Sequence, residues 1–350
     1  MKRAFSGPDA DEKYERAGKW LLAAVYGRKE ARDWCDKAGI KFTKAQGEGI
    51  GSAGGFLVPV ELASAILDIR DAYGAFRRRA LVYPMGSDST GFARRTGGTT
   101  AAFIGEGVAA GAATPTFDRV TLTAKKLGAL ITVSSELDED SLYDLVDYVA
   151  NEMGVALASK EDDCAFFGDG TSTYGGIRGC TILANDGNHT KAKVTAAVGH
   201  NTYLLLDATD LGTLVTQVRA SAIPRAAWFM SQTAFAQTVV RLAAGAGGAF
   251  LQTGEVDGIP TPFFNGFPVI LTQKFSLTAT SITTQAMMAF GDMYAAGVLG
   301  QRRGLTIRRS EERYFDTDQI AILGTERFDA VVHDMGDNTT AGSLAVLFAP

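Results

Sequence analysis

The sequence has few cysteines, little proline, no long apolar run and no excess of basic charge. Three cysteines in 350 residues, Cys35, Cys164 and Cys180, are too few and too scattered for a disulfide framework or a zinc site, so we expect a reducing, intracellular setting. No apolar run approaches the roughly 18 residues of a membrane span, and the charged N-terminus lacks the apolar core of a signal peptide. With 34 Lys and Arg against 39 Asp and Glu, the chain has a net charge of −5, which argues against a protein dedicated to nucleic-acid binding.

The common motifs of catalysis are also missing. Neither G-x-S-x-G, nor H-E-x-x-H, nor the phosphate loop G-x-x-x-x-G-K-[ST] occurs, and His189, His200 and His333 lie far apart. The nearest phosphate-binding candidate is the glycine-rich stretch 168–176, but it follows the end of a helix, and Asp169 would repel a phosphate. A tight helix-exit turn is the preferred interpretation. We therefore expect that the protein is not an enzyme and has no catalytic residues, no cofactor and no metal site.

Glycine is the residue in excess, with 40 copies against 9 prolines. It gathers in residues 47–55, 84–115, 168–179 and 245–266. Long glycine-rich loops on an otherwise packed chain suggest segments that become ordered only against a partner. With 46% hydrophobic and 21% charged residues the chain is still that of a folded protein of about two domains.

The first 49 residues differ from the rest, because they carry a net charge of +3 and leave −8 for the remainder. Apolar residues have helical spacing around Trp20 (with Leu21, Ala24 and Val25) and again at Ala31, Trp34 and Cys35. Each stripe is too short for a core of its own, so we expect an arm that lies on another surface. A frayed terminus is the alternative.

Two helices are predicted in the globular part. Leu62, Ile66, Ile69 and Tyr73 fall on one helical face that Gly74 ends, and the basic triplet Arg77–Arg79 that follows is expected to face water rather than phosphate or acidic side chains. An apolar stripe over Ser141–Phe167 predicts a helix about 40 Å long. Acidic residues abound between Ser134 and Asp163, and we expect a solvated acidic face. A metal site at Asp138–Asp140 is disfavoured, since consecutive positions do not share a helix face.

The intervening and later segments predict strands. Residues 80–134 resemble one long hairpin whose middle thirty residues carry few large apolar side chains, so it cannot fold over a core of its own. Residues 180–300 predict a mixed α/β region with buried strands at 228–230, 267–271 and 287–290. Alternation near 305–307, 320–322 and 328–332 predicts a terminal antiparallel sheet. The fold class is α+β.

Several short motifs, in order, resemble landmarks of the major capsid proteins of tailed bacteriophages, which have the Hong Kong 97 fold. They are Gly54-Gly55-Phe56-Leu57-Val58-Pro59, the run Phe117–Leu137 with Val133-Ser134 and Glu136-Leu137, Gly168-Asp169-Gly170-Thr171, Gly175–Gly179, Trp228–Ser231, Gly266–Val269 and Phe290-Gly291-Asp292. Each motif is weak by itself, but their order and spacing together are specific. The resemblance covers about residues 50–333.

The resemblance implies a layout of domains. It assigns residues 1–55 to an N-terminal arm, 56–79 to the first part of a peripheral domain and 80–134 to an extended β-hairpin loop that reaches over a neighbour. It further assigns 135–179 to the spine helix and its exit turn, 180–304 to an axial domain and 305–350 to the return strands of the peripheral domain and the C-terminus.

The resemblance also implies a function and partners. Copies would form pentamers and hexamers of an icosahedral shell around double-stranded DNA, without sequence specificity or a membrane, in a virion assembled in the host cytoplasm. Portal, scaffold or decoration proteins are further partners of this family. Candidate inter-subunit contacts are Arg94, Arg95, Glu106, Glu311, Glu312 and Arg313, and candidate glycines of the loop near the symmetry axes are Gly245, Gly247 and Gly248.

Two departures from the family pattern limit the transfer. In some relatives a lysine of the extended loop forms a covalent cross-link with an asparagine of a neighbouring subunit. No lysine lies between Arg79 and Lys125 here, so no such cross-link is expected. Relatives often carry a fused scaffold of about a hundred residues, whereas about fifty precede Gly54; the scaffold is then separate, unnecessary or already removed. A nanocompartment shell of the same fold and a phosphate-binding enzyme are the alternatives.

Reversing one charge at the predicted three-fold contact tests this scheme. Arg313→Glu places a carboxylate where the resemblance puts an inter-subunit ion pair, and like charges in an interface repel. We expect the variant to remain folded by circular dichroism but to form no particles in size-exclusion chromatography. Particles at the level of the parent protein would refute this role of Arg313.

Overall fold

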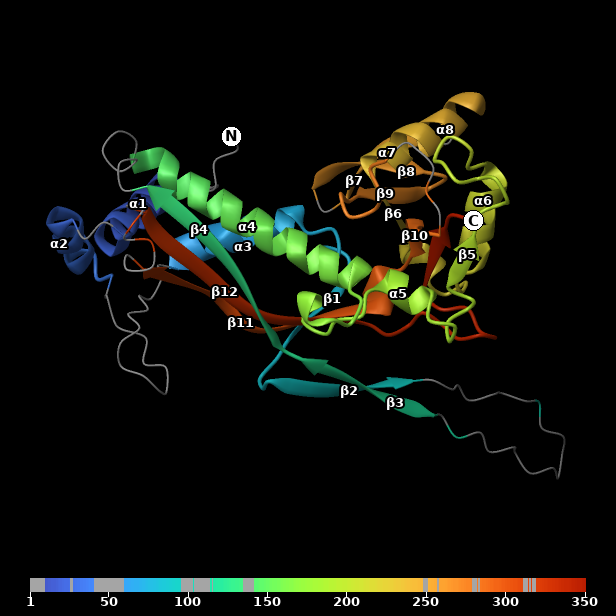
Figure 1. Cartoon of the computed structure of the whole chain (residues 1–350), viewed down its shortest axis with the longest axis horizontal. Helices are drawn as coiled ribbons and strands as arrows, with labels where there is room; N and C mark the ends of the chain where they lie inside the picture. Colours follow the sequence, from blue (N-terminus) through green and yellow to red (C-terminus); the bar gives the residue numbers. More distant parts are fainter. Residues whose placement is uncertain are drawn as a thin grey trace.

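A long helix lies along a four-stranded sheet at one end of the molecule, and a seven-stranded sheet forms the other end (Figure 1). A two-stranded hairpin leaves the body below the long helix in that view. The computed structural model describes residues 10–25, 28–40, 60–95, 103, 114, 116–134, 142–247, 251–256, 258–278, 282, 284–310, 314, 316 and 319–350.

The four-stranded sheet is built from distant parts of the chain in the order β1-β11-β12-β4. Its strands are β1 (Leu81–Pro84), β4 (Lys125–Ser134), β11 (Gly297–Ser310) and β12 (Gln319–Val332). β12 pairs antiparallel with both β4 and β11, which confirms the predicted antiparallel sheet. Its buried positions alternate from Ile322 to Phe328, and the side chains of Ile320 and Ile322 belong to the cluster that the helices form with the sheet.

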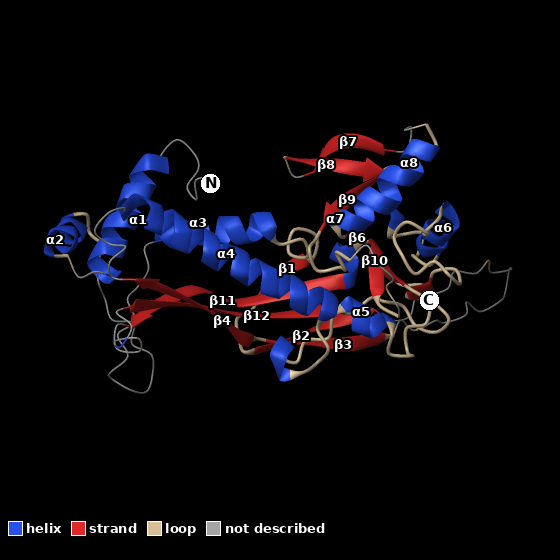
Figure 2. Cartoon of the chain, turned by 45° about the horizontal axis from the view of Figure 1, so that its top comes forward, coloured by secondary structure: helices blue, strands red, loops and turns tan. Residues whose placement is uncertain are grey.

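Two helices cover one face of this sheet (Figure 2). They are α3 (Val60–Tyr73) and the 26-residue α4 (Leu142–Phe167), which agrees with the predicted long helix to within a residue. α3 packs closely on α4 at Gly154, because a Cβ there would lie 2.8 Å from Cγ2 of Ile69. Tyr73, expected on the buried face of α3, is instead 62% exposed.

The N-terminal helices pack on the same core. α1 (Ala10–Val25) and α2 (Lys29–Lys37) bury Trp20 and Cys35 in one cluster with Ile66 of α3 and Met153 of α4. The helical spacing of this segment is thus confirmed, and residues 10–25 and 28–40 are not a frayed terminus. The surface on which they lie belongs to their own chain.

The extended segment is shorter than predicted. Among the described residues of this segment, β2 (Ser89–Arg95) and β3 (Phe117–Thr123) form the isolated two-stranded hairpin. The prediction of one hairpin over 80–134 is wrong at both ends, because β1 pairs with β11 and β4 pairs with β12 in the four-stranded sheet. The alternating apolar residues of β4, such as Ile131 and Val133, complete that sheet's buried face.

The seven-stranded sheet has the order β5-β13-β10-β6-β9-β8-β7. Its strands are β5 (Lys193–Thr195), β6 (Ala227–Met230), β7 (Leu251–Val256), β8 (Ile259–Phe264), β9 (Phe267–Leu271), β10 (Ala286–Gly291) and β13 (Leu344–Phe348). The other helical segments of the described chain are η2 (Ser172–Tyr174), α5 (Cys180–Ala184), α6 (Ala208–Thr216), η3 (Ile223–Arg225), α7 (Gln232–Ala234), η4 (Phe235–Val240), α8 (Arg241–Gly245) and α9 (Met293–Ala296). The three strands predicted between 228 and 290 are confirmed.

The C-terminal strand lies apart from the strands that precede it. Of residues 305–350, which the resemblance assigns to the return strands and the C-terminus, 305–310 and 319–332 lie in the four-stranded sheet. β13 lies between β5 and β10 in the other sheet, where all five of its residues are buried. A turn stabilised by Asp337, whose side chain accepts hydrogen bonds from the amides of Thr339 and Thr340, redirects the chain. Among the described residues no helix is long and apolar enough to cross a membrane.

Candidate functional site: a buried charge cluster and the candidate contact surfaces

Four charged side chains are buried where α3, α4 and β12 meet. Arg70 donates to Glu326 across 2.8 Å, and both side chains are at most 2% exposed. Arg77 makes a bidentate pair with Glu161, with nitrogen–oxygen distances of 2.6 and 2.9 Å. Asp71, which is 54% exposed, lies 3.0 Å from Arg70 and 3.6 Å from Arg77, so the two guanidinium groups meet two buried carboxylates and one at the surface. We call the four buried residues the charge cluster.

The charge cluster joins four elements that are distant in the sequence. Arg70 lies on α3, Glu161 on α4 and Glu326 on β12, and Arg77 also donates to the side-chain oxygen of Gln301 on β11 at 3.0 Å. Burial raises the pKa of Glu326 to about 7, and the nearby charge of Glu161 adds to that effect. Burial opposes the charge on Arg77, but its hydrogen bond with Glu161 raises the pKa of the guanidinium.

Asp162, the neighbour of Glu161, holds the turn that follows α3. Its two carboxylate oxygens accept hydrogen bonds from the backbone amides of Ala75 and Phe76 at 2.9 and 2.8 Å. Burial raises its pKa to about 6, although these two bonds favour the charged form. The turn itself is buried, with Phe76 packed edge-on against Phe166 of α4 at 6.0 Å.

The sequence analysis missed this cluster. Glu161 and Asp162 were expected on a solvated acidic face, and Arg77 in a solvated basic triplet; both expectations are wrong, since all three are buried. The sequence nevertheless contained a pattern that indicates burial of these charges. Glu161 lies four residues after the buried Leu157, and Arg70 four after the buried Ile66, so each charge falls on the apolar stripe of its own helix. Charges in such positions are rarely buried unless they are paired.

The predicted contact residues fall into two groups. Arg94 and Arg95 lie on β2, where Arg94 donates to the backbone oxygen of His333 and lies 3.5 Å from Asp118 of β3. Its guanidinium is thus engaged within its own chain, one pair before the outermost described pair of the hairpin, Arg95 and Phe117. The remaining candidates, Glu106, Glu311, Glu312 and Arg313, lie outside the described residues.

The predicted axial glycines lie at the end of α8. Gly245 is its last residue, and both Gly245 and Gly247 are exposed. Gly247 has φ +76°, a conformation that other residues rarely adopt, which explains the choice of glycine at this turn. Gly248 lies outside the described residues, as does the acidic stretch Asp138–Asp140.

The glycine-rich stretch after α4 is a compact turn. Gly170 has φ +83°, and the carboxylate of Asp169 accepts the amide of Thr171 at 2.8 Å. Hydrogen bonds from the side chain and the amide of Thr171 lower the pKa of Asp169. Gly179 and Gly168 are joined by a backbone hydrogen bond of 2.7 Å. These contacts agree with a helix-exit turn, and the amide of Thr171 that a phosphate would use is already occupied.

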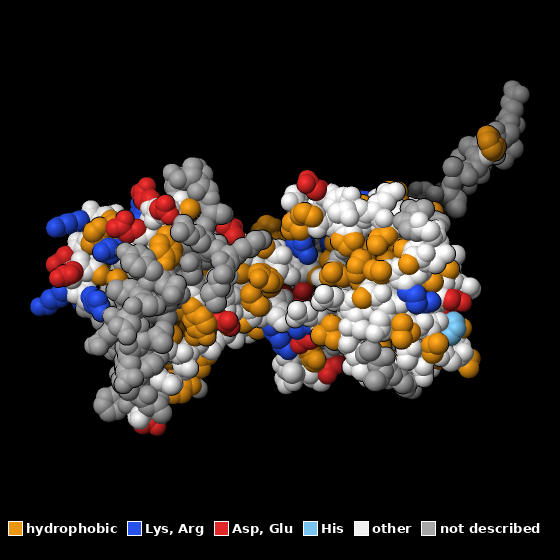
Figure 3. Space-filling model, turned by 90° about the horizontal axis from the view of Figure 1, so that it is seen from above, with side chains coloured by type: hydrophobic (Ala, Val, Ile, Leu, Met, Phe, Trp, Pro, Cys, Tyr) orange, Lys and Arg blue, Asp and Glu red, His pale blue; other side chains and the backbone are white. Residues whose placement is uncertain are grey.

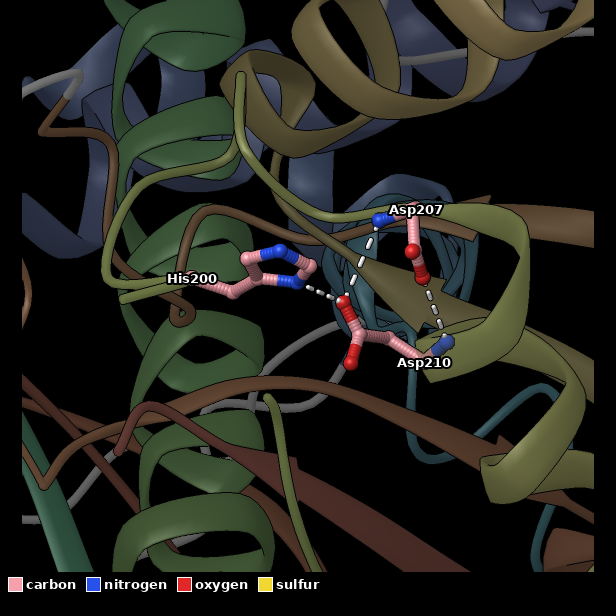
Figure 4. A group of neighbouring side chains, drawn as sticks. All are labelled: His200, Asp207 and Asp210. Atoms are coloured by element: carbon pink, nitrogen blue, oxygen red, sulfur yellow. Dashed lines mark hydrogen bonds and ion pairs between the residues drawn. The ribbon is translucent and has the colours of Figure 1, made fainter. Parts of the chain in front are cut away.

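One group of side chains has the composition of a metal site. His200, Asp207 and Asp210 lie together before and at the start of α6 (Figure 4). The ring Nδ1 of His200 is 2.5 Å from Asp210, which also accepts the amides of Ala197 and Asp207. The Asp207 carboxylate accepts the amides of Thr209 and Asp210, which completes a capping box. The carboxylates thus serve to cap a helix, which accounts for this group without an ion.

The three cysteines, Cys35, Cys164 and Cys180, are buried and free. Burial raises the pKa of Cys164 to about 11 and that of Cys180 to about 12, so both remain protonated thiols. They behave as small apolar side chains in the core.

Comparison with known proteins identifies relatives of the whole arrangement. The sequence matches the phage capsid family over residues 54–335. It is 28% identical over 120 residues to the major capsid protein of Klebsiella oxytoca phage phiKO2, an alignment that spans 34% of this chain and 28% of that protein.

Solved structures with similar folds cover more of the chain. The capsid of an empty GTA particle computed with C5 symmetry matches with a TM-score of 0.55 at 20% identity, over 90% of this chain and 97% of that one. A structure from Mycobacterium phage Cain matches with a TM-score of 0.56 at 16% identity, over 79% and 90%. At these identities the likeness concerns the fold, and it agrees with the α+β capsid fold expected from the sequence.

Removing one charge from the cluster should destabilise the subunit strongly. Glu161→Gln keeps the shape of the side chain but leaves Arg77 buried without its carboxylate partner, a change that typically costs about 3 kcal/mol or more. Glu152→Gln, on an exposed position of the same helix, should leave the free energy of unfolding nearly unchanged. Urea unfolding of the isolated subunit measures both, and equal stabilities would show that the cluster contributes nothing.

Mild acid should stabilise the isolated subunit. The pKa values of Asp162 and Asp329 are raised to about 6 and that of Glu326 to about 7, so the folded state takes up protons before the unfolded state does. Burial lowers the pKa of His333, so this residue alone makes the folded state less stable in acid. The three carboxyl groups together outweigh it. We expect the free energy of unfolding to rise by about 1 kcal/mol or more between about pH 7.5 and about pH 5.5.

The matched control for this pH dependence is Glu326→Gln. Its amide cannot take up a proton, so the rise in stability on acidification should be smaller than in the parent protein, whatever the starting stability. A parent subunit that loses stability over the same range would contradict the raised pKa values.

Proposed function

This chain belongs to the phage capsid family, and from that premise we propose that it is a major capsid protein whose copies assemble into an icosahedral shell around double-stranded DNA. In this role the chain acts through its surfaces and not through catalysis. Many modest contacts, repeated in every copy, add up to a stable shell by multivalency. Its place is then the virion, with portal, scaffold or decoration proteins as further partners.

The observation that carries the proposal is the β2–β3 hairpin. Its root is fixed, because Phe92 packs edge-on against His333 at 5.5 Å and the amide of Thr123 donates to buried Asp329. Beyond the root, Phe117 is 64% exposed, and the two strands pair only with each other among the described residues. A two-stranded ribbon is at best marginally stable in water, so a firmly anchored one that leaves the body suits a subunit with neighbours.

Exposed apolar side chains on the lobe with the seven-stranded sheet support the same conclusion. Figure 3 shows such side chains spread over this lobe. They include Val198, Leu204 and Leu205, which are 98%, 53% and 49% exposed. Contiguous exposed apolar surface marks protein–protein contacts, and we propose that the adjacent Leu204 and Leu205 belong to such a contact.

The two ends of the molecule suit the two domains of a capsid subunit. In this proposal the four-stranded sheet with α3, α4 and the N-terminal helices is the peripheral domain, and the seven-stranded sheet is the axial domain. The turn at Gly245 and Gly247 then points toward the five-fold and six-fold axes. The net charge of −8 outside the first 49 residues suits a shell that binds its DNA only weakly.

Electron microscopy of the purified full-length protein tests the proposal. We expect uniform hollow particles in negative stain whose averages show five-fold vertices, and particles from an expressing host should protect double-stranded DNA from nuclease. A protein that stays monomeric at high concentration, with or without a co-expressed scaffold, would contradict it. Particles filled with a defined enzyme instead of DNA would indicate a nanocompartment.

A further inference from the structure

The strand β7 leaves one edge of the seven-stranded sheet open. It is the last strand of that sheet, with β8 on one side and, among the described residues, no strand on the other. The β7–β8 hairpin lies at the rim of its lobe (Figure 2). Three of its six residues, Gln252, Thr253 and Glu255, are exposed.

The two long edges of this hairpin differ in chemistry. On β8, Pro260 and Pro262 pair with Glu255 and Thr253 of β7. Antiparallel pairs alternate between bonded and non-bonded, and a proline cannot donate, so these two pairs are the non-bonded ones. The N–H and C=O groups of Thr253 and Glu255 therefore point away from β8, toward the open edge. Pro260 and Pro262 offer no N–H donor toward the other side of β8, where β9 pairs with Phe263 and Phe264.

Proteins usually protect an open edge with proline, lysine or a bulge. β7 has none of these: its sequence is Leu-Gln-Thr-Gly-Glu-Val, and its register with β8 is continuous from Leu251 to Val256. The hairpin is thus blocked along one edge and left as a template for strand addition along the other.

We propose that the open edge of β7 pairs with a strand of the β2–β3 hairpin from a second copy of this chain. The inference rests on the proposed shell function, which supplies the second copy. β2 and β3 have seven residues each against six in β7, whereas β5, at the other edge of the large sheet, has three. Among the described residues, the β2–β3 ribbon has no strand on either outer edge.

The charges of the two hairpins are complementary. β2 and β3 carry Arg94, Arg95 and Arg119 against Asp118, a net charge of +2. Residues 251–264 carry Glu255 and Asp257, a net charge of −2. Opposite charges favour this encounter and disfavour pairing of β7 with another β7. Pairing adds the marginal β2–β3 ribbon to the edge of a seven-stranded sheet, which is a more stable arrangement for that ribbon.

The variant Thr253→Pro tests the open edge. Thr253 forms a non-bonded pair with Pro262, so a proline there keeps the hydrogen bonds to β8 but removes an outward donor. Thr253→Val is the matched control, because it keeps the N–H group and the β-branched shape. We expect similar circular dichroism and unfolding midpoints for both, but an increase of about tenfold or more in the subunit concentration needed for assembly of the proline variant.

Equal assembly of the two variants would overturn the inference and leave the shell function intact. Failure of the parent protein to form particles would instead refute the proposed function. Should the proline variant misfold, a second measurement decides. Benzoylphenylalanine at position 253, in assembled particles, should form photo-cross-links to residues 89–95 or 117–123 of another copy. Cross-links to any other segment, β7 of another copy included, would overturn the choice of partner strand.

Discussion

The structure depends on two buried ion pairs, between Arg70 and Glu326 and between Arg77 and Glu161. Burying four charges is costly, and such pairs are no more stabilising than a well-packed apolar core. Their value is geometric. A bidentate guanidinium–carboxylate pair admits few arrangements, so α3, α4 and β12 are held in one relation to each other. Asp162 extends this fixation to the turn that leads into β1.

The body of the subunit fixes the direction in which the β2–β3 hairpin leaves it. β2 and β3 follow directly from the sheet that the cluster fixes, and Asp329, three residues after Glu326 on β12, accepts the amide of Thr123 at the hairpin's root. The direction in which the hairpin leaves the body is therefore set within the subunit. Its outer part finds no partner strand in the described part of its own chain. The division between a self-sufficient body and a dependent hairpin is what a shell subunit needs.

Much of the fold could be predicted from local patterns. The helices α3 and α4 and the buried strand β6 depend on residues close in the sequence, and the structure confirms them apart from the exposed Tyr73 at the end of α3. The assignment of β13 and β4 to their sheets depends on pairing between distant segments, which periodicity does not encode. The burial of the charge cluster was not predicted for a related reason. A charged residue is expected to face solvent unless its partners on the other elements are known.

Amide hydrogen exchange of the isolated subunit and of assembled particles tests the central claim most directly. The account predicts that amides of α4 around Glu161 and of β12 around Glu326 are protected in both states, whereas those of the outer part of the hairpin, around Arg95 and Phe117, become protected only in particles. A hairpin as protected in the isolated subunit as in the particle would contradict the claim that its outer part depends on other copies.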